Sequence, residues 1–248
     1  IDTLSRERLM EYHQQSVRPE NVVLTVAGAV EADEVRELVA GLWDGVPKGY
    51  LGLELPGAPD FPTRDGETAL ATEREQTVLY WLWPGLELDD PRRFEQDLLD
   101  AVLSGIYLPN GRLHFALRGA GLVYAVHAFP LAGRVPAAFA LYLGTEPGKV
   151  AEAREIVDRE LERISTEPVP DDELERGKSM LTVSRYVYDL STAAARLQQA
   201  AVNELFGVGY DFDSDYIDEI EDLEADELME FAAELFAQPH LYLRYGNE

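Results

Sequence analysis

The two ends of this 248-residue chain carry the same pattern, which is a helix, then a proline, then a strand that closes on a glycine. The first copy reads RERLMEYHQQSVRPENVVLTVAG over residues 6–28, and the second reads ADELMEFAAELFAQPHLYLRYG over residues 225–246. Their spacing of about 220 residues is the length of a whole domain rather than that of a small stacked repeat. The duplication therefore predicts that both ends of the chain are ends of domains.

A segment between residues 45 and 64 separates two parts of the chain. It contains four prolines and four glycines, a composition that suits neither a helix nor an inner strand. We therefore expect residues 1–44 to be the helix–strand–helix tail of a preceding domain. Residues 45–64 would then be a linker, and residues 65–248 one complete domain of the same kind.

Hydrophobic periodicity predicts a mixture of helices and strands. In the tail, a helix begins after Ser5, a buried strand follows over 21–28, and a second helix covers 32–43. The strands expected in the complete domain are 67–73, 77–85, 122–131, 137–144 and 241–246. Its expected helices are 90–104, 111–118, one that begins at 150, a helical stretch over 171–206 with a break near 189–191, and two more before the last strand. This mixture predicts an α+β fold in which a mainly antiparallel sheet packs against several helices.

The chain is strongly acidic, with 47 acidic and 21 basic residues and a formal net charge of −26. Nucleic acids and anionic membranes would repel such a protein, so neither is expected as a partner. No apolar run approaches the roughly 20 residues that cross a bilayer, so no membrane insertion is expected. The absence of cysteine excludes disulfides, thiol catalysis and thiolate metal sites. We expect a soluble bacterial protein, with the cytoplasm and the periplasm both open as its compartment.

The stretch ALRGAGLVYAV, residues 116–126, contains two glycines two positions apart. A phosphate-binding loop requires the order strand, glycines, helix, whereas here a helix precedes the glycines and a strand follows them. We therefore interpret Gly119 and Gly121 as a structural turn that ends the helix, with one of them in the left-handed conformation.

The glycine turn does not account for the residues beside it, Arg118 and Tyr124. By composition alone, Arg118 is a surface arginine favoured by the helix dipole. Alternation along the strand places Tyr124 on one face with Leu122 and Val126, and His127 on the other.

Neither zinc nor calcium is expected to bind this chain. Its four histidines form neither His-Glu-x-x-His nor the inverse His-x-x-Glu-His, and we expect structural or surface roles for them. The acidic stretch DFDSDYIDEIED, residues 211–222, departs from a calcium loop because Tyr216 replaces its glycine and Asp222 its bidentate glutamate. We expect these acids to cap helix N-termini and to solvate an outer face.

Two passages resemble the pitrilysin or insulinase type of zinc protease, which includes the mitochondrial processing peptidases. Residues 4–47 are similar to the segment that closes a domain of that family, with a helix, Arg-Pro-x-Asn, a strand ending in glycine and a helix. Residues 111–129, GRLHFALRGAGLVYAVHAF, are similar to the Gly-Arg-Leu helix and the Leu-Arg, Gly-Leu-x-Tyr passage of its non-catalytic C-terminal domain. The resemblance spans essentially the whole chain. It implies tandem homologous domains, of which one carries zinc on His-x-x-Glu-His and the other completes the substrate chamber.

The resemblance also implies substrate-binding roles for Arg118 and Tyr124. In the family, the arginine and tyrosine of this passage reach across the chamber to the substrate backbone near the scissile bond. Such roles suit their chemistry, because a tyrosine hydroxyl can donate to a developing oxyanion and an arginine fork can hold a peptide carbonyl. The usual pattern has one more residue between the arginine and the glycine, so Arg118 is expected about a third of a helical turn from the usual place.

The sequence leaves two functions open, both compatible with a chain that has no zinc ligands or catalytic residues of its own. In the first, the chain is the inactive half of a zinc metalloendopeptidase and orients a peptide substrate, while zinc sits in a catalytic domain or subunit elsewhere. In the second, it is a structural module, as in the respiratory-complex core subunits that resemble these proteases. The expected partners are that zinc-bearing domain and the peptide. We also expect that the apolar strand of residues 1–44 can pair with a second copy and form a homodimer.

Overall fold

A computed structural model describes residues 4–49, 60–72, 75–106, 109–133 and 138–247. The chain divides into two compact units, Ile1–Leu55 with Asp189–Phe212, and Pro56–Tyr188 with Asp213–Glu248. Half of the predicted linker, residues 50–59, lies outside the described residues. Among the described helices, none is long and apolar enough to cross a membrane.

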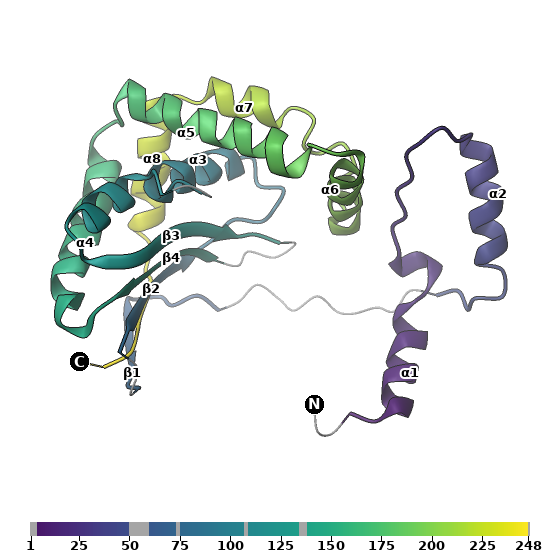
Figure 1. Cartoon of the computed structure of the whole chain (residues 1–248), viewed down its shortest axis with the longest axis horizontal. Helices are drawn as coiled ribbons and strands as arrows, with labels where there is room; N and C mark the ends of the chain where they lie inside the picture. The colour runs from purple at the N-terminus through teal and green to yellow at the C-terminus, as the bar shows by residue number, and fades with distance from the viewer. Residues whose placement is uncertain (1–3, 50–59, 73–74, 107–108, 134–137, 248) are drawn as a thin grey trace. The chain divides into compact units, whose positions relative to one another are not determined.

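The larger unit is built on a five-stranded sheet with the strand order β1-β5-β2-β4-β3 (Figure 1). Its strands are β1 (Gly66–Leu70), β2 (Thr77–Pro84), β3 (Val123–Leu131), β4 (Ala138–Thr145) and β5 (Leu241–Tyr245). The strands β1 and β5 pair in parallel, and every other neighbouring pair is antiparallel. The prediction of an α+β fold with a mainly antiparallel sheet is therefore confirmed.

Strand β2 shows how the sequence pattern directs one face of the sheet into the core. Its residues Leu79, Trp81 and Trp83 are 0%, 1% and 2% exposed, whereas Tyr80 and Leu82 between them are half-buried. This is the alternation expected of a strand that has a fully covered face and a partly covered one.

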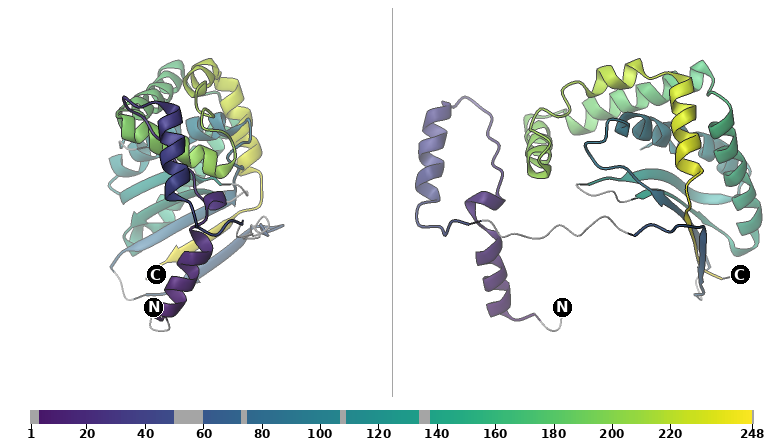
Figure 2. Two further views of the ribbon diagram at one scale, coloured as in Figure 1. Left: turned by 90° about the vertical axis from the view of Figure 1, so that its right-hand side faces the viewer. Right: turned by 180° about the vertical axis from the view of Figure 1, so that it is seen from behind.

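Helices cover the face of the sheet toward which the β2 tryptophans point (Figures 1 and 2). They are α3 (Arg93–Ser104), α4 (Val150–Thr166), α5 (Asp171–Ser184), α7 (Tyr216–Asp222) and α8 (Ala225–Phe236), with the π-helical turn η2 (His114–Arg118). The short η3 (Pro147–Lys149) precedes α4, and the π-helical turn η4 (Arg185–Asp189) follows α5. Each long helix contributes an apolar stripe to one continuous core. The helical stretch predicted over 171–206 is divided by η4, close to the predicted break.

The end of α3 lies directly against Gly111, which stands three residues before η2. A Cβ on Gly111 would lie 2.4 Å from the carbonyl oxygen of Leu103 and 2.5 Å from the carbonyl carbons of Leu103 and Ser104. These are main-chain atoms, and both residues are fully buried. The close approach therefore requires glycine at this position.

The smaller unit contains α1 (Arg6–Ser16), the short η1 (Pro19–Asn21), α2 (Ala32–Leu42) and α6 (Ala193–Phe206). Neither α1 nor α2 has a buried residue. The buried strand predicted over 21–28 is wrong, because this segment belongs to no ladder of the described residues and Val22, Leu24 and Val26 are 44%, 59% and 48% exposed. A strand needs a neighbouring strand to satisfy its amides, and no part of the chain that the structure describes supplies one.

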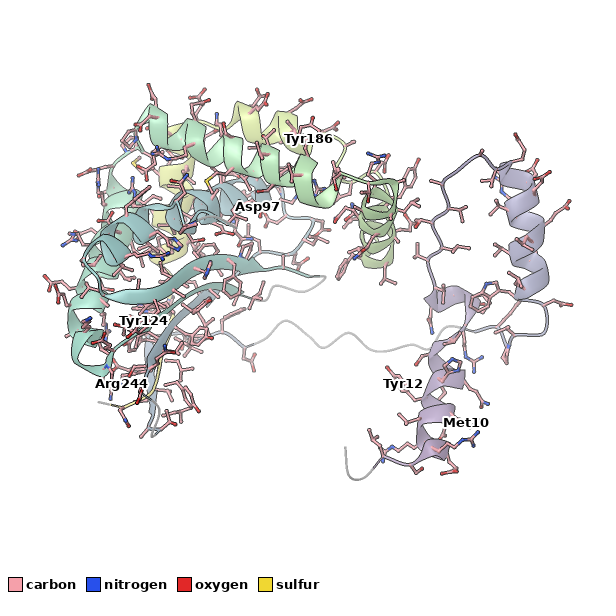
Figure 3. The ribbon with its side chains drawn as sticks, viewed as in Figure 1. Met10, Tyr12, Asp97, Tyr124, Tyr186 and Arg244 are labelled. Carbon is pink, nitrogen blue, oxygen red and sulfur yellow. The ribbon has the colours of Figure 1, made fainter. Side chains whose placement is uncertain are left out.

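Two half-buried carboxyl groups, those of Asp97 and Asp100, lie about one turn apart on α3, and Figure 3 labels Asp97. Asp97 Oδ2 accepts a hydrogen bond from the hydroxyl of Tyr216 at 2.8 Å, and Asp100 Oδ1 lies 2.6 Å from Ser104 Oγ. Burial raises the pKa of Asp97 to about 6 and that of Asp100 to about 7, although the hydrogen bonds from Tyr216 and Ser104 act in the opposite direction. The Ser104 hydroxyl also reaches the carbonyl oxygen of Ala128 at 3.1 Å. The hydroxyl donates to Asp100 Oδ1 and to the carbonyl oxygen of Ala128, so its one proton is shared between two acceptors.

We expect Asp100→Asn to stabilise the protein at pH 8 by on the order of 2 kcal/mol and to have little effect at pH 4. The folded-state pKa of about 7 lies above the ordinary value of 3.8. The stabilisation from a neutral Asp100 is therefore complete below pH 3.8 and is lost as the pH rises through about 7. Urea unfolding at a series of pH values measures this difference, with Asp89→Asn as the control for an exposed carboxylate. Equal pH slopes for Asp100→Asn and the parent chain would contradict a proton held at Asp100.

Candidate functional site

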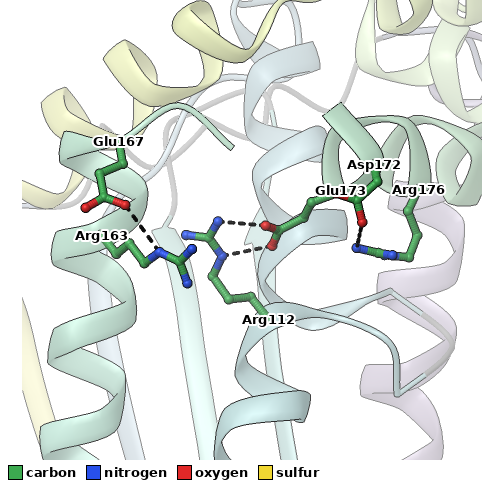
Figure 4. A network of polar contacts seen from close by, with 6 residues as sticks. All are labelled: Arg112, Arg163, Glu167, Asp172, Glu173 and Arg176. Carbon is green, nitrogen blue, oxygen red and sulfur yellow. Dashed lines mark hydrogen bonds and ion pairs between the residues drawn. The ribbon is translucent and has the colours of Figure 1, made fainter. Parts of the chain in front are cut away.

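The helix that carries Arg118 is anchored to α5 by a buried ion pair (Figure 4). Arg112 Nε and Nη2 donate to Glu173 Oε1 and Oε2, both at 2.8 Å. The two side chains are only 5% and 17% exposed. Such a bidentate pair fixes the direction of the helix as well as its position.

The glycines after Arg118 end this helix in two different conformations. Gly121 has a φ of +68°, in the left-handed region, whereas Gly119 is still helical at −59°. The amide of Gly121 donates to the carbonyl oxygen of Arg118, and the amide of Leu122 donates to that of Leu117, both at 3.0 Å. These two bonds form a Schellman turn, which leads the chain from η2 directly into β3.

Tyr124 occupies a β-bulge at the start of β3. Val123 pairs with Thr145 and Ala125 with Gly144, so Tyr124 is the extra residue between two consecutive positions of β4. The prediction that Tyr124 shares a face with Leu122 and Val126 is wrong, because those two are 4% and 0% exposed whereas Tyr124 is 57% exposed. The bulge interrupts the alternation and turns the tyrosine out of the core.

The Tyr124 hydroxyl takes part in a polar cluster that joins β3 to the turn after β4. It donates to Glu146 Oε1 at 3.1 Å, and Lys149 Nζ donates to the same oxygen at 3.0 Å and to the carbonyl oxygen of Gly121 at 3.2 Å. The hydrogen bond to Glu146 and its charge raise the pKa of Tyr124, so the phenol stays protonated as a donor. The hydrogen bonds from Lys149 and Tyr124 lower the pKa of Glu146.

Arg118 is exposed at the end of η2. Among the residues that the structure describes, none forms a hydrogen bond or an ion pair with its guanidinium group. The structure therefore carries Arg118 and Tyr124 on opposite sides of one glycine turn, with the tyrosine bound to Glu146 and the arginine side chain available to a ligand.

An aromatic row crosses the sheet on the face opposite the core, a feature that the sequence did not lead us to predict. Tyr80, Tyr142 and His127 are register partners on β2, β4 and β3. The Tyr80 and Tyr142 rings stack with centroids 5.6 Å apart, and the Tyr142 and His127 rings at 5.4 Å. Phe129 meets Tyr142 edge-on at 6.2 Å, and His114 meets His127 edge-on at 5.8 Å. Burial, His127 and Arg118 lower the pKa of His114.

Neither the ring contacts of the aromatic row nor the contacts of Tyr124 with Glu146 can be read from a local sequence pattern. The stacking depends on the register between strands, and no local pattern shows that Tyr80 on β2 meets Tyr142 on β4 or that Tyr142 meets His127 on β3. Glu146 and Lys149 occupy an ordinary polar turn whose local pattern shows no reason to contact Tyr124.

The acidic stretch 211–222 differs in part from its predicted role. Asp213 does not solvate an outer face, because its side chain is 12% exposed and lies 3.3 Å from Arg93 Nη1 and 2.6 Å from Arg185 Nη2. These contacts tie the end of α5 to the start of α3, so Asp213 has a structural role. Among the described residues, no group of three or more His, Asp or Glu side chains is placed to hold a metal ion.

Comparison with known proteins identifies one family. Residues 3–181 match the sequence model of the family described as peptidase M16 inactive domain. An uncharacterized zinc protease of Rickettsia bellii strain RML369-C is 23% identical over 185 residues, which are 73% of this chain and 43% of that protein.

Several solved structures have the same fold. The crystal structure of a peptidase M16 inactive domain from Pseudomonas fluorescens superposes with a TM-score of 0.82 at 19% identity, covering 100% of this chain and 58% of that one. The crystal structure of a protease from Helicobacter pylori also superposes with a TM-score of 0.82. It is 16% identical, and the match covers 98% of this chain and 60% of that one. A chain of complex III2 from Candida albicans, with Inz-5 bound, superposes with a TM-score of 0.79. It is 12% identical, and the match covers 99% of this chain and 60% of that one. This chain thus spans less than two thirds of the length of each of these relatives.

Proposed function

The chain belongs to the peptidase M16 inactive-domain family, and from this premise we propose that it binds and orients a peptide substrate for a zinc-bearing domain or subunit elsewhere. The resemblance to an inactive domain of a zinc protease, first drawn from its motifs, is confirmed by the family match. The substrate-binding role rests on the site around the glycine turn.

The observation that carries the proposal is the outward turn of Tyr124. A bulge directs a large aromatic side chain to 57% exposure although Val123 just before it and Val126 two residues after it are buried. Bulges of this kind often re-aim a side chain next to a functional site. Lys149 also donates to Glu146 Oε1, so this carboxylate keeps a partner when the Tyr124 hydroxyl leaves it. The hydroxyl can then donate to a carbonyl oxygen of the substrate instead. Arg118 adds a guanidinium fork on the other side of the same turn.

The aromatic row extends this site along the sheet. Tyr80, Tyr142 and Phe129 offer ring faces and edges to the apolar side chains of an extended peptide. Burial lowers the pKa of His114, which favours the uncharged form of the ring at the end of the row. The row therefore suits a peptide with apolar side chains near its scissile bond.

The repeat supports a preceding domain of the same kind. In the second copy, Leu228 and Phe231 are 0% and 6% exposed within the core of the larger unit. Their counterparts in the first copy, Leu9 and Tyr12, are 53% and 64% exposed. The same apolar pattern is thus buried in one copy and uncovered in the other. We propose that residues 1–44 close a preceding homologous domain, and that zinc is bound by a domain or subunit outside this chain.

We expect Tyr124→Phe to lower kcat/KM about tenfold when the chain is assayed together with its catalytic domain, because one hydrogen bond to the substrate is lost. The assay measures hydrolysis of a fluorogenic peptide, and the chain alone is expected to hydrolyse none. Tyr186→Phe is the matched control, because Tyr186 is also 57% exposed but lies in η4, away from β3 (Figure 3). Equal rates for the Tyr124 and Tyr186 variants would exclude the role of Tyr124 in binding.

The likeness to a chain of complex III2 favours one alternative function, that of a structural module in an assembly. In that case, the reconstituted complex would assemble through this chain, and both tyrosine variants would leave its activity unchanged.

A further inference from the structure

The segment at the end of β4 binds the glycine turn of the candidate site at two points. Thr145, the last residue of β4, is fully buried, and its hydroxyl donates to the carbonyl oxygen of Leu122 at 2.6 Å. Lys149 Nζ donates to the carbonyl oxygen of Gly121 at 3.2 Å. Two consecutive carbonyl groups thus accept hydrogen bonds from residues 145–149. Because the bond from Thr145 is buried, it fixes the turn against this segment, and Lys149 has a defined anchor there.

The backbone holds Glu146 and Lys149 close together. Pro147 begins η3, and the amide of Lys149 donates to the carbonyl oxygen of Glu146 at 3.0 Å. Lys149 Nζ lies 3.0 Å from Glu146 Oε1. An ammonium group has three N–H donors, so it can bind this carboxylate and the Gly121 carbonyl at the same time. Lys149 is therefore a second donor, held in place, to the oxygen that also accepts from Tyr124.

The two donors to Glu146 Oε1 differ in charge. The ammonium group of Lys149 neutralises the carboxylate, whereas the phenol of Tyr124 is a neutral donor. The hydrogen bond to Glu146 and its charge raise the pKa of Tyr124, and the charge of Lys149 acts in the opposite direction. The charge of Glu75 adds to the effect of Glu146. The ammonium group therefore weakens the hold of the carboxylate on the tyrosine hydroxyl.

We propose that Lys149 is a positioning residue of the peptide site, which sets how readily the Tyr124 hydroxyl leaves Glu146 for a substrate carbonyl. This inference rests on the proposed function, in which Tyr124 binds the substrate. Without the ammonium group, the carboxylate would hold the phenol more strongly, and less of the hydroxyl would be free for the peptide. The expected effect is moderate, because the Glu146 side chain is 50% exposed and water also binds it.

In the peptide assay with the catalytic domain, Lys149→Met should lower kcat/KM about fivefold. The double variant Glu146→Gln, Lys149→Met should return to within about twofold of the parent protein, because a neutral amide holds the phenol only weakly. If Lys149 had only a structural role, removal of its partner would not restore activity. Lys178→Met is the matched control. Lys178 also pairs with a glutamate three residues before it and donates to a main-chain carbonyl, but it lies on α5.

A second measurement needs neither the peptide nor the catalytic domain. In protein labelled with ¹³C at the tyrosine ζ carbon, the signal of Tyr124 is identified by its absence from Tyr124→Phe. At neutral pH, this signal moves toward its phenolate position as the hydroxyl donates more strongly. Lys149→Met should therefore move it toward the phenolate position, and Glu146→Gln should move it away.

Two results would overturn the proposal. The first is an unchanged Tyr124 signal in Lys149→Met. The second, given that Tyr124→Phe lowers the rate of hydrolysis, is a Lys149→Met variant that keeps the parent rate or whose loss the double variant does not restore. If Tyr124→Phe and Lys149→Met both leave hydrolysis unchanged while the Tyr124 signal moves as expected, the proposed function fails and the coupling of Lys149 to Tyr124 stands.

Discussion

Replacing Gly111 with alanine is expected to lower the free energy of unfolding of the larger unit by about 3 kcal/mol or more. The new methyl group would lie 2.4 Å from the carbonyl oxygen of Leu103. Main-chain atoms at the end of a buried helix cannot move aside as a flexible side chain can, so η2 and α3 would have to separate. Urea unfolding followed by the fluorescence of the buried Trp81 and Trp83 measures the loss.

The same substitution eight residues later is the control. At Gly119 an added Cβ meets nothing within 4 Å, and the backbone is helical. Gly119→Ala is therefore expected to change stability by less than about 1 kcal/mol, in the stabilising direction. If the two alanine variants unfolded at the same urea concentration, the close packing of η2 on α3 would be refuted.

The second large effect is expected at the buried ion pair between Arg112 and Glu173. Arg112→Met and Glu173→Met should each cost about 3–5 kcal/mol, because each leaves a desolvated group without its partner. The double variant Arg112→Met, Glu173→Met should recover a large part of that loss, since no charge then stays buried. A double-mutant cycle from urea unfolding gives the coupling energy.

A neighbouring ion pair on α5 is the matched control (Figure 4). Arg176 lies 3.5 Å from Asp172, but these side chains are 39% and 79% exposed. Arg176→Gln is expected to cost no more than about 0.5 kcal/mol, because water screens the pair. A similar cost at Arg112 and Arg176 would mean that burial does not decide the strength of these pairs.

The sequence predicted the fold of the larger unit because its signals are local. The alternation in β2 and the apolar stripes of α3, α4 and α8 are each visible within one element. The core that these elements form follows from covering apolar faces, whatever the details of pairing.

The errors fall where structure depends on distant parts of the chain. The strand predicted over 21–28 has the right pattern, but a strand also needs a partner, and no described residue supplies it. The face of Tyr124 depends on the pairing of Val123 and Ala125 with consecutive residues of β4, which no local periodicity reveals. The sequence predicts a surface position for Asp213, because no local pattern shows that its partners are Arg93 and Arg185, which lie far from it in the chain.

The segment from η2 to the bulge at Tyr124 has two places where the length of the chain can change by one residue. The π-helical turn η2 and the bulge at Tyr124 each hold one residue more than a regular helix or ladder. A deletion of one residue at either place would restore regular geometry and leave the buried Leu117 and Leu122 in the core. A deletion of one residue at either place is therefore expected to leave this domain folded and to change the direction of the side chain beside it, Arg118 or Tyr124.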